Sequence, residues 1–164
     1  MSNKTIEMNK NFTIIIITIC FFIKIFFGFY LKNINPEFFI LQDSISYIDP
    51  SKKLCEIGKF YDKDNIPVTF RVPGMSIFLM PAVCFGIDLN YYILIINSIL
   101  LLLTAYLTYK IIKLMKINTS LLFIFLFFWL NPTLLRYQFS ILSEIPSLFV
   151  FTLALFFFSH AIIE

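Results

Sequence analysis

Long apolar runs alternate with short polar stretches along this chain. Four runs are candidates for transmembrane helices, since a helix needs about 20 residues to cross a bilayer. They are residues 12–30, 91–112, 120–129 and 145–163. The third is interrupted just past its end by Asn131-Pro132. The pattern therefore predicts an all-α membrane protein with about four transmembrane helices.

A fifth apolar piece, MSIFLMPAVCFG, lies between residues 73 and 86. About 12 residues are too few to span a bilayer, and Pro81 divides the piece. We interpret it as a re-entrant or interfacial segment. No small-residue cleavage site follows residues 27–30, so the first span is interpreted as an uncleaved anchor.

The polar stretch LQDSISYIDPSKKLCEIGKF, residues 41–60, directly follows the first span region. Its second half contains Asp49, Pro50 and, eight residues later, Gly58. An aspartate before the first turn, a proline in it and a glycine just past the end are typical of a short helix. The sequence predicts a juxtamembrane helix capped by Asp49.

Lysine placement predicts the orientation. Lys110, Lys113 and Lys116 lie at the end of the second span and just after it, without an accompanying acid, and Lys4 and Lys10 precede the first span. By the positive-inside rule, the N-terminus and the connection after the second span belong in the cytoplasm. We expect a cytoplasmic N-terminus (1–11), a transmembrane domain (12–164) and a first extracytoplasmic loop (about 32–90), in the plasma membrane.

Composition agrees with a membrane protein and excludes one class of function. Of 164 residues, 59% are hydrophobic and only 14% are charged, against about half and a quarter in ordinary soluble domains. The net charge is only +3, and the loop lysines alternate with acids. The chain lacks the basic tract that follows a nucleic-acid backbone, so we expect no nucleic-acid partner.

The cysteines and the single histidine point to no metal or disulfide. Cys20 and Cys84 fall in apolar segments, and Cys55 stands alone in the outer loop. Three cysteines without paired spacing predict neither a disulfide framework nor a metal site. His160, near the end of the last span, is interpreted as structural.

Two charged residues lie where charge is costly. Asp43 follows the first span, and a carboxylate at a membrane boundary is partly desolvated, which favours a role as a base. The alternative is an ordinary solvated aspartate. Lys24 lies within the first span, where a cation suggests a functional pairing or a snorkelling side chain. No acid in the other spans is an obvious partner.

The outer loop resembles one enzyme family. The matching positions are Asp43-Ser44-x-x-Tyr47, Leu54, Gly58-x-Phe60, Pro67 and FRVPGMSIFLMP from Phe70 to Pro81. Together they are similar to the first extracytoplasmic loop of GT-C integral-membrane glycosyltransferases, in the branch of protein mannosyltransferases and lipid A aminoarabinose transferases. Met75 and Ser76 stand where that branch has Tyr and Pro. The likeness continues loosely through Asn131-Pro132 and Leu142-Ser143-Glu144.

The resemblance implies transfer of a sugar from a polyprenyl-phosphate donor to a lipid, glycan or protein acceptor at the extracytoplasmic membrane face. It implies Asp43 as general base, Arg71 as the cation that stabilises the departing phosphate, and Tyr47 and Glu144 as substrate-binding residues. It assigns no cofactor with certainty, and a divalent cation stays open. Because such enzymes are several times longer, we expect this chain to be the amino-terminal portion of one. It is then either an inactive fragment or a part that acts with the remainder as a partner.

Each assignment has a simpler alternative. Arg71 can instead pair with Asp62, Asp64 or lipid headgroups. Tyr47 can be an interfacial aromatic residue, and Glu144 an acid in the first turn of a helix. A non-catalytic membrane scaffold tolerates loss of Asp43 and Arg71. A small transporter-like protein is the other alternative, although the two pairs of spans do not match as repeats.

Overall fold

The computed structural model describes residues 10–163. Within that range it contains helices, connecting segments and an isolated β-bridge between Tyr61 and Pro67. The helices are α1 (Lys10–Ile34), α2 (Ile45–Ile57), α3 (Gly74–Cys84), α4 (Leu89–Leu114), α5 (Leu121–Leu130), α6 (Pro132–Phe139) and α7 (Glu144–Ile163), with 3₁₀ helices η1 (Pro36–Phe39) and η2 (Gln42–Ser44). Residues 1–9 of the predicted cytoplasmic N-terminus lie outside the described residues.

Three of the described helices are long and apolar enough to cross a membrane: Phe12–Ile34, Leu89–Leu114 and Glu144–Ile162. A fourth crossing requires α5 and α6 to act together, and their axes are bent by 70° at Asn131. The prediction of an all-α membrane protein is therefore confirmed in its general form. The break predicted at Asn131-Pro132 is present.

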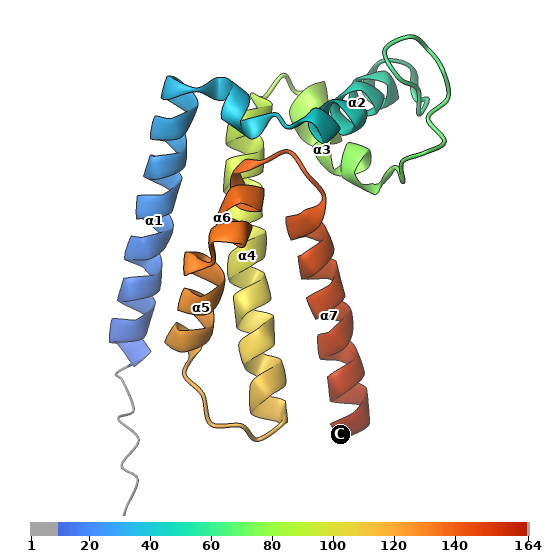
Figure 1. Ribbon diagram of the computed structural model, residues 1–164. Helices are drawn as coiled ribbons and strands as arrows, with labels where there is room; N and C mark the ends of the chain where they lie inside the picture. Colours follow the sequence, from blue (N-terminus) through green and yellow to red (C-terminus); the bar gives the residue numbers. More distant parts are fainter. Residues whose placement is uncertain (1–9, 164) are drawn as a thin grey trace, which may run out of the picture.

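The helices form two groups (Figure 1). One group, the bundle, contains α1, α4, α5, α6 and α7, which run alongside one another. The other, the α2–α3 pair, lies at the end of the bundle where α1 finishes and α4 starts. The α4–α5 connection and the C-terminal end of α7 lie at the opposite end.

Helix α4 forms the centre of the bundle, because it packs against α1, α5, α6 and α7. Its Leu94 and Leu101 are fully buried, in two different apolar clusters. Gly28 brings α1 close to α4: a Cβ there would lie 2.6 Å from the Leu94 side chain. A larger residue at this crossing would require the Leu94 side chain to shift.

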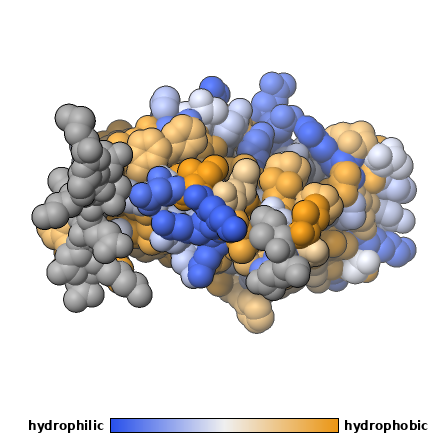
Figure 2. All heavy atoms as spheres, turned by 90° about the horizontal axis from the view of Figure 1, so that it is seen from below, coloured by the Kyte–Doolittle hydropathy of each residue, from blue (hydrophilic) through white to orange (hydrophobic). Residues whose placement is uncertain are grey.

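The outward faces of α1 and α7 are apolar and exposed. They carry large side chains that the rest of the described chain does not cover: Phe22, Ile23, Phe26, Val150, Phe151, Phe157 and Phe158. Seen from the end opposite the α2–α3 pair, a group of hydrophilic side chains lies among hydrophobic ones (Figure 2). Exposed apolar helix faces of this extent fit a lipid environment.

The start of α2 differs from the prediction. The helix begins at Ile45, so Asp49 and Pro50 lie inside it and Asp49 is not its cap. The reason is that η2 leads directly into α2, and the Ser44 hydroxyl accepts a hydrogen bond from the Leu41 amide at 2.9 Å. The predicted end is confirmed: Gly58 has φ +67°, and its amide donates to the Leu54 carbonyl.

Pro81 does not divide the apolar piece between residues 73 and 86, contrary to prediction. Helix α3 runs through it from Gly74 to Cys84. Proline removes a single backbone hydrogen bond, and the helix resumes at once because the Phe85 amide donates to the Pro81 carbonyl at 3.2 Å. Eleven residues remain too few to span a bilayer.

Candidate functional site

Three residues singled out from the sequence meet beside the α2–α3 pair. The Arg71 Nη2 donates to Asp43 Oδ1 at 2.5 Å, and its Nη1 donates to the Tyr47 hydroxyl at 3.4 Å. The guanidinium carbon lies 5.2 Å from the centroid of the Tyr47 ring. Arg71 thus joins a carboxylate and a phenol that precede it in the chain by 28 and 24 residues.

Local structure places each of these side chains. Asp43 lies in η2 and Tyr47 in the first turn of α2, four residues later, so both project from one side of a continuous helical segment. The Tyr47 ring is anchored in an apolar cluster with Met75, Leu79 and Ile141. This packing fixes the position of the Tyr47 ring and therefore of its hydroxyl.

The guanidinium retains unused donor capacity. Arg71 Nε is buried and has no hydrogen-bond partner, and the 3.4 Å bond to Tyr47 is long. The side chain of Asp43 is 64% exposed and that of Arg71 is 29% exposed. An anion approaching from solvent can therefore reach both ends of the ion pair.

Asp62, one alternative partner of Arg71, bonds elsewhere. Asp62 Oδ1 accepts hydrogen bonds from the amides of Asp64 and Ile66, at 2.9 and 2.8 Å, and so closes the turn between residues 62 and 66. The alternative in which Arg71 pairs with Asp62 or Asp64 is wrong. Its carboxylate partner is Asp43.

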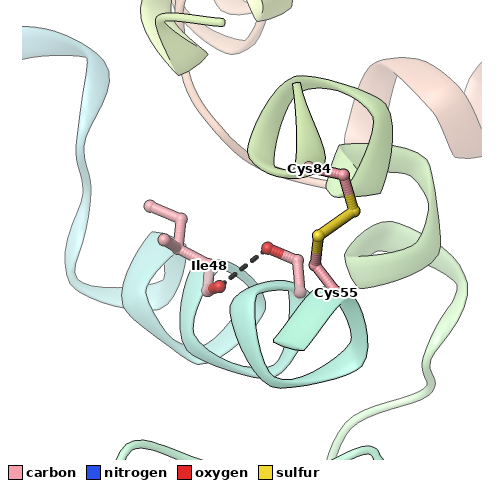
Figure 3. Close-up of a disulfide and its surroundings, with 4 residues drawn as sticks. Ile48, Cys55 and Cys84 are labelled. Carbon is pink, nitrogen blue, oxygen red and sulfur yellow. Dashed lines mark hydrogen bonds between the residues drawn. A yellow bond between two sulfur atoms is a disulfide. The ribbon is translucent and has the colours of Figure 1, made fainter. Parts of the chain in front are cut away.

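A disulfide joins Cys55 in α2 to Cys84 in α3 (Figure 3). The two Cα atoms are 5.6 Å apart, within the usual range for a disulfide. Nearer the start of α2, the Ser51 hydroxyl donates to the Ile48 carbonyl at 2.7 Å, the dashed bond in Figure 3. The prediction that no cysteines pair was wrong, because the two positions are 29 residues apart and their spacing carries no signal.

The disulfide closes the loop that carries Arg71. Residues 56–83 lie between the two cysteines, so the bond limits how far Arg71 can move from η2 and α2. The ion pair with Asp43 is thereby supported by a covalent link rather than by surface electrostatics alone.

Glu144 is not brought to this cluster. It occupies the first turn of α7, as predicted, and its side chain is exposed. Ile141 and Leu142, just before it, pack in the same apolar cluster as Tyr47. The carboxylate of Glu144, however, makes no contact with Asp43 or Arg71 in the part of the chain that the structure describes.

Lys24 has the partner that sequence reasoning missed. Its Nζ donates to the Trp129 carbonyl at 2.8 Å and lies 4.1 Å from the centroid of the Trp129 ring. The Trp129 indole N–H in turn donates to the Cys20 carbonyl at 3.3 Å. Lys24 thus connects α1 to the end of α5 through backbone and ring, which is a structural role.

A second ion pair joins α1 to the start of α4. Lys32 Nζ donates to Asp88 Oδ2 at 2.6 Å, while Asp88 Oδ1 accepts from the Asn90 and Tyr91 amides and caps α4. Partial desolvation raises the pKa of Asp88, but the hydrogen bonds from Lys32 and the amides outweigh it and hold that pKa below its usual value. An aspartate just before an apolar helix was the signal for this cap.

Among residues 10–163, no three His, Cys, Asp or Glu side chains are grouped so that they could hold a metal ion. Comparisons with protein-family models, curated proteins and solved structures found no match to this chain.

Proposed function

We propose that this chain carries part of the site of a membrane glycosyltransferase, which moves a sugar from a polyprenyl-phosphate donor to an acceptor at the extracytoplasmic face. The observation that supports this proposal most directly is the contact of Arg71 with both Asp43 and Tyr47. A base, a phosphate-binding cation and a positioning hydroxyl are the three groups that the transfer requires of the protein.

The chemistry assigns one step to Asp43 and one to Arg71. The acceptor hydroxyl or amine attacks the anomeric carbon, and Asp43 takes its proton. The bond from that carbon to the phosphate oxygen breaks, and the polyprenyl phosphate leaves with the bonding electrons. Arg71 stabilises the resulting negative charge through its guanidinium, whose Nη1 makes only a long 3.4 Å bond to Tyr47.

In the resting site the Arg71–Asp43 bond keeps both groups in place before substrate arrives. A phosphate that replaces the long Tyr47 contact at Nη1 would leave Nη2 on the carboxylate, so the base and the leaving group are held by one planar guanidinium. Asp43, the proton acceptor, and the departing phosphate are then held in a fixed position relative to each other.

Two features support an extracytoplasmic position for this site. The lysines after α4 favour a cytoplasmic location for the opposite end of the bundle. A disulfide between α2 and α3 favours an oxidising compartment, which lies outside the cytoplasm. The lysines and the cysteines are different residues, and both support an extracytoplasmic α2–α3 pair.

The test separates binding from transfer. Native mass spectrometry of the purified chain measures the retention of polyprenyl phosphate, and release of that lipid from a polyprenyl-phosphate sugar in membranes measures transfer. Arg71→Gln is expected to weaken retention at least about 10-fold, through loss of charge-assisted hydrogen bonds. Asp43→Asn is expected to keep retention while lowering release at least about 100-fold, the size of a general-base effect.

Matched controls lie on the same helix. Lys52→Gln and Glu56→Gln change exposed charges of α2 that do not contact Asp43 or Arg71, and both are expected to retain binding and transfer. If Arg71→Gln and Lys52→Gln weaken retention equally, Arg71 is not a phosphate-binding residue. If Asp43→Asn leaves release unchanged, the Asp43–Arg71 pair is a surface contact of a non-catalytic membrane scaffold.

A further inference from the structure

A recess lies at the end of the bundle opposite the candidate transferase site. Its volume is about 300 Å³, and Lys110, Lys113, Leu114, Phe156 and His160 line it. Three of these residues come from the last turns of α4 and two from the last turns of α7. This is the end of the molecule viewed in Figure 2, where hydrophilic side chains lie among hydrophobic ones.

The basic side of the recess comes from α4. Lys110 and Lys113 are three residues apart, about one helical turn, so both ammonium groups project from the same face. Neither lysine has a carboxylate partner among residues 10–163. Two such charges exceed the roughly half negative charge at the C-terminal end of each of the two helices. The recess therefore favours an anion.

The other side of the recess is apolar. Leu114 and Phe156 face it, and the Phe156 and His160 rings are in contact, with their centroids 5.9 Å apart. Next to it, α7 continues into exposed Phe157 and Phe158, which fit lipid contact. A water-soluble anion gains nothing from contact with these apolar side chains. A phosphate attached to acyl chains matches both sides, since its charge meets the lysines and its chains meet the phenylalanines.

We propose that this recess between the ends of α4 and α7 binds the phosphate of an anionic phospholipid headgroup. Lys110 and Lys113 hold the phosphate oxygens, and the imidazole of His160 closes the third side. The acyl chains extend along the apolar faces of the two helices. A water-soluble phosphate shares the headgroup chemistry, so the experiment must separate the two sources.

The test measures lipid retention by the full chain. The protein is purified in a neutral detergent, supplied with phosphatidylglycerol or phosphatidylcholine, and examined by native mass spectrometry. We expect retention of phosphatidylglycerol at least about 10-fold above phosphatidylcholine. The Lys110→Gln/Lys113→Gln double variant is expected to lower phosphatidylglycerol retention about 30-fold, from the effect of two lysines on anionic lipid.

Lys116→Gln is the matched control, because Lys116 is an exposed cation at the same end and does not line the recess. It is expected to change retention less than about threefold. A loss equal to that of the double variant would overturn the proposal in favour of diffuse attraction. Competition by millimolar inorganic phosphate would assign the recess to a soluble anion instead. Unchanged Trp129 fluorescence in each variant shows that the bundle remains folded.

Discussion

The two helix groups use their cations in opposite ways. In the bundle, Lys24 is 6% exposed and bonds a backbone carbonyl and an indole ring. Beside the α2–α3 pair, Arg71 bonds a carboxylate that faces solvent. One cation is enclosed by other helices, and the other remains accessible to a ligand. The position of the cation, rather than its charge, separates a structural role from a candidate site.

The bundle needs Lys24 because of the break between α5 and α6. Helix α5 ends at Leu130, and the Thr133 amide donates to the Asn131 side chain instead of to the Trp129 carbonyl. A carbonyl without a partner is costly at membrane depth, where water is absent. The Lys24 ammonium supplies the missing donor, so the bent pair tolerates its 70° break.

The α2–α3 pair is held differently. It is joined to the bundle through a cluster containing Tyr47, Leu79, Ile93 and Ile141, and its two helices are joined to each other by a disulfide. Two short helices bury less apolar area than a bundle does, so a covalent link contributes more to their order. This contrast makes the α2–α3 pair separable from the bundle by experiment.

The largest expected effect comes from the disulfide. The Cys55→Ser/Cys84→Ser variant should destabilise the α2–α3 pair by about 2–4 kcal/mol, because the loop of 29 residues regains its freedom in the unfolded state. Proteolysis of residues 58–73 in detergent should become faster, while the thermal midpoint reported by Trp129 fluorescence should stay unchanged.

Cys20→Ser is the control, since Cys20 is the free cysteine of the described chain. It should leave proteolysis at the rate of the unsubstituted protein. A double variant whose Trp129 midpoint fell together with its protease resistance would show that the two groups unfold as one unit.

The second effect concerns Lys24. Lys24→Met leaves the Trp129 carbonyl without a donor and should destabilise the bundle by about 1–3 kcal/mol. The loss of the ammonium over the ring should also shift the emission of Trp129, the single tryptophan of the chain. Thermal unfolding followed by that emission measures both changes.

Ile23→Met is the matched substitution for Lys24→Met, because Ile23 neighbours Lys24 on α1 and is 62% exposed. It should leave the midpoint and the emission unchanged. Equal midpoints for the two variants would mean that the Trp129 carbonyl finds another donor and that Lys24 is dispensable.

The sequence was informative where structure is set locally. The apolar runs predicted the long helices, Gly58 predicted the end of α2, and Asn131-Pro132 predicted the break after α5. Each of these depends on residues within one or two helical turns. The start of α2 was missed because a 3₁₀ turn feeds directly into it, which removes the need for a cap at Asp49.

Contacts between distant residues were only partly predictable. Asp43, Tyr47 and Arg71 were singled out together, and the structure brings them into contact. The pairing of Cys55 with Cys84 and of Lys24 with Trp129 was not foreseen. Both depend on the packing of helices far apart in the chain, which no local pattern encodes.

The smallest expected effect concerns Asp88, where the bundle meets the α2–α3 pair. Asp88→Asn keeps an oxygen to cap α4 but removes the charge that Lys32 pairs with, so it should cost less than about 1 kcal/mol. Asp88→Ala removes both, and the lost cap should cost about 0.5–2 kcal/mol. Thermal midpoints in detergent at pH 7 should therefore fall in the order wild type, Asp88→Asn, Asp88→Ala.

The pH dependence separates the charge from the cap. The pKa of Asp88 is lowered in the folded protein, so its pairing stabilises the fold fully above the ordinary value of 3.8 and is lost as pH falls through the lower folded value. The difference between wild type and Asp88→Asn should thus be constant from pH 7 to about 5 and shrink below about 4. The cost of Asp88→Ala relative to Asp88→Asn should persist, because an asparagine cap does not titrate. A wild-type advantage over Asp88→Asn that survives at pH 2 would instead place the contribution of Asp88 in packing and not in its ion pair with Lys32.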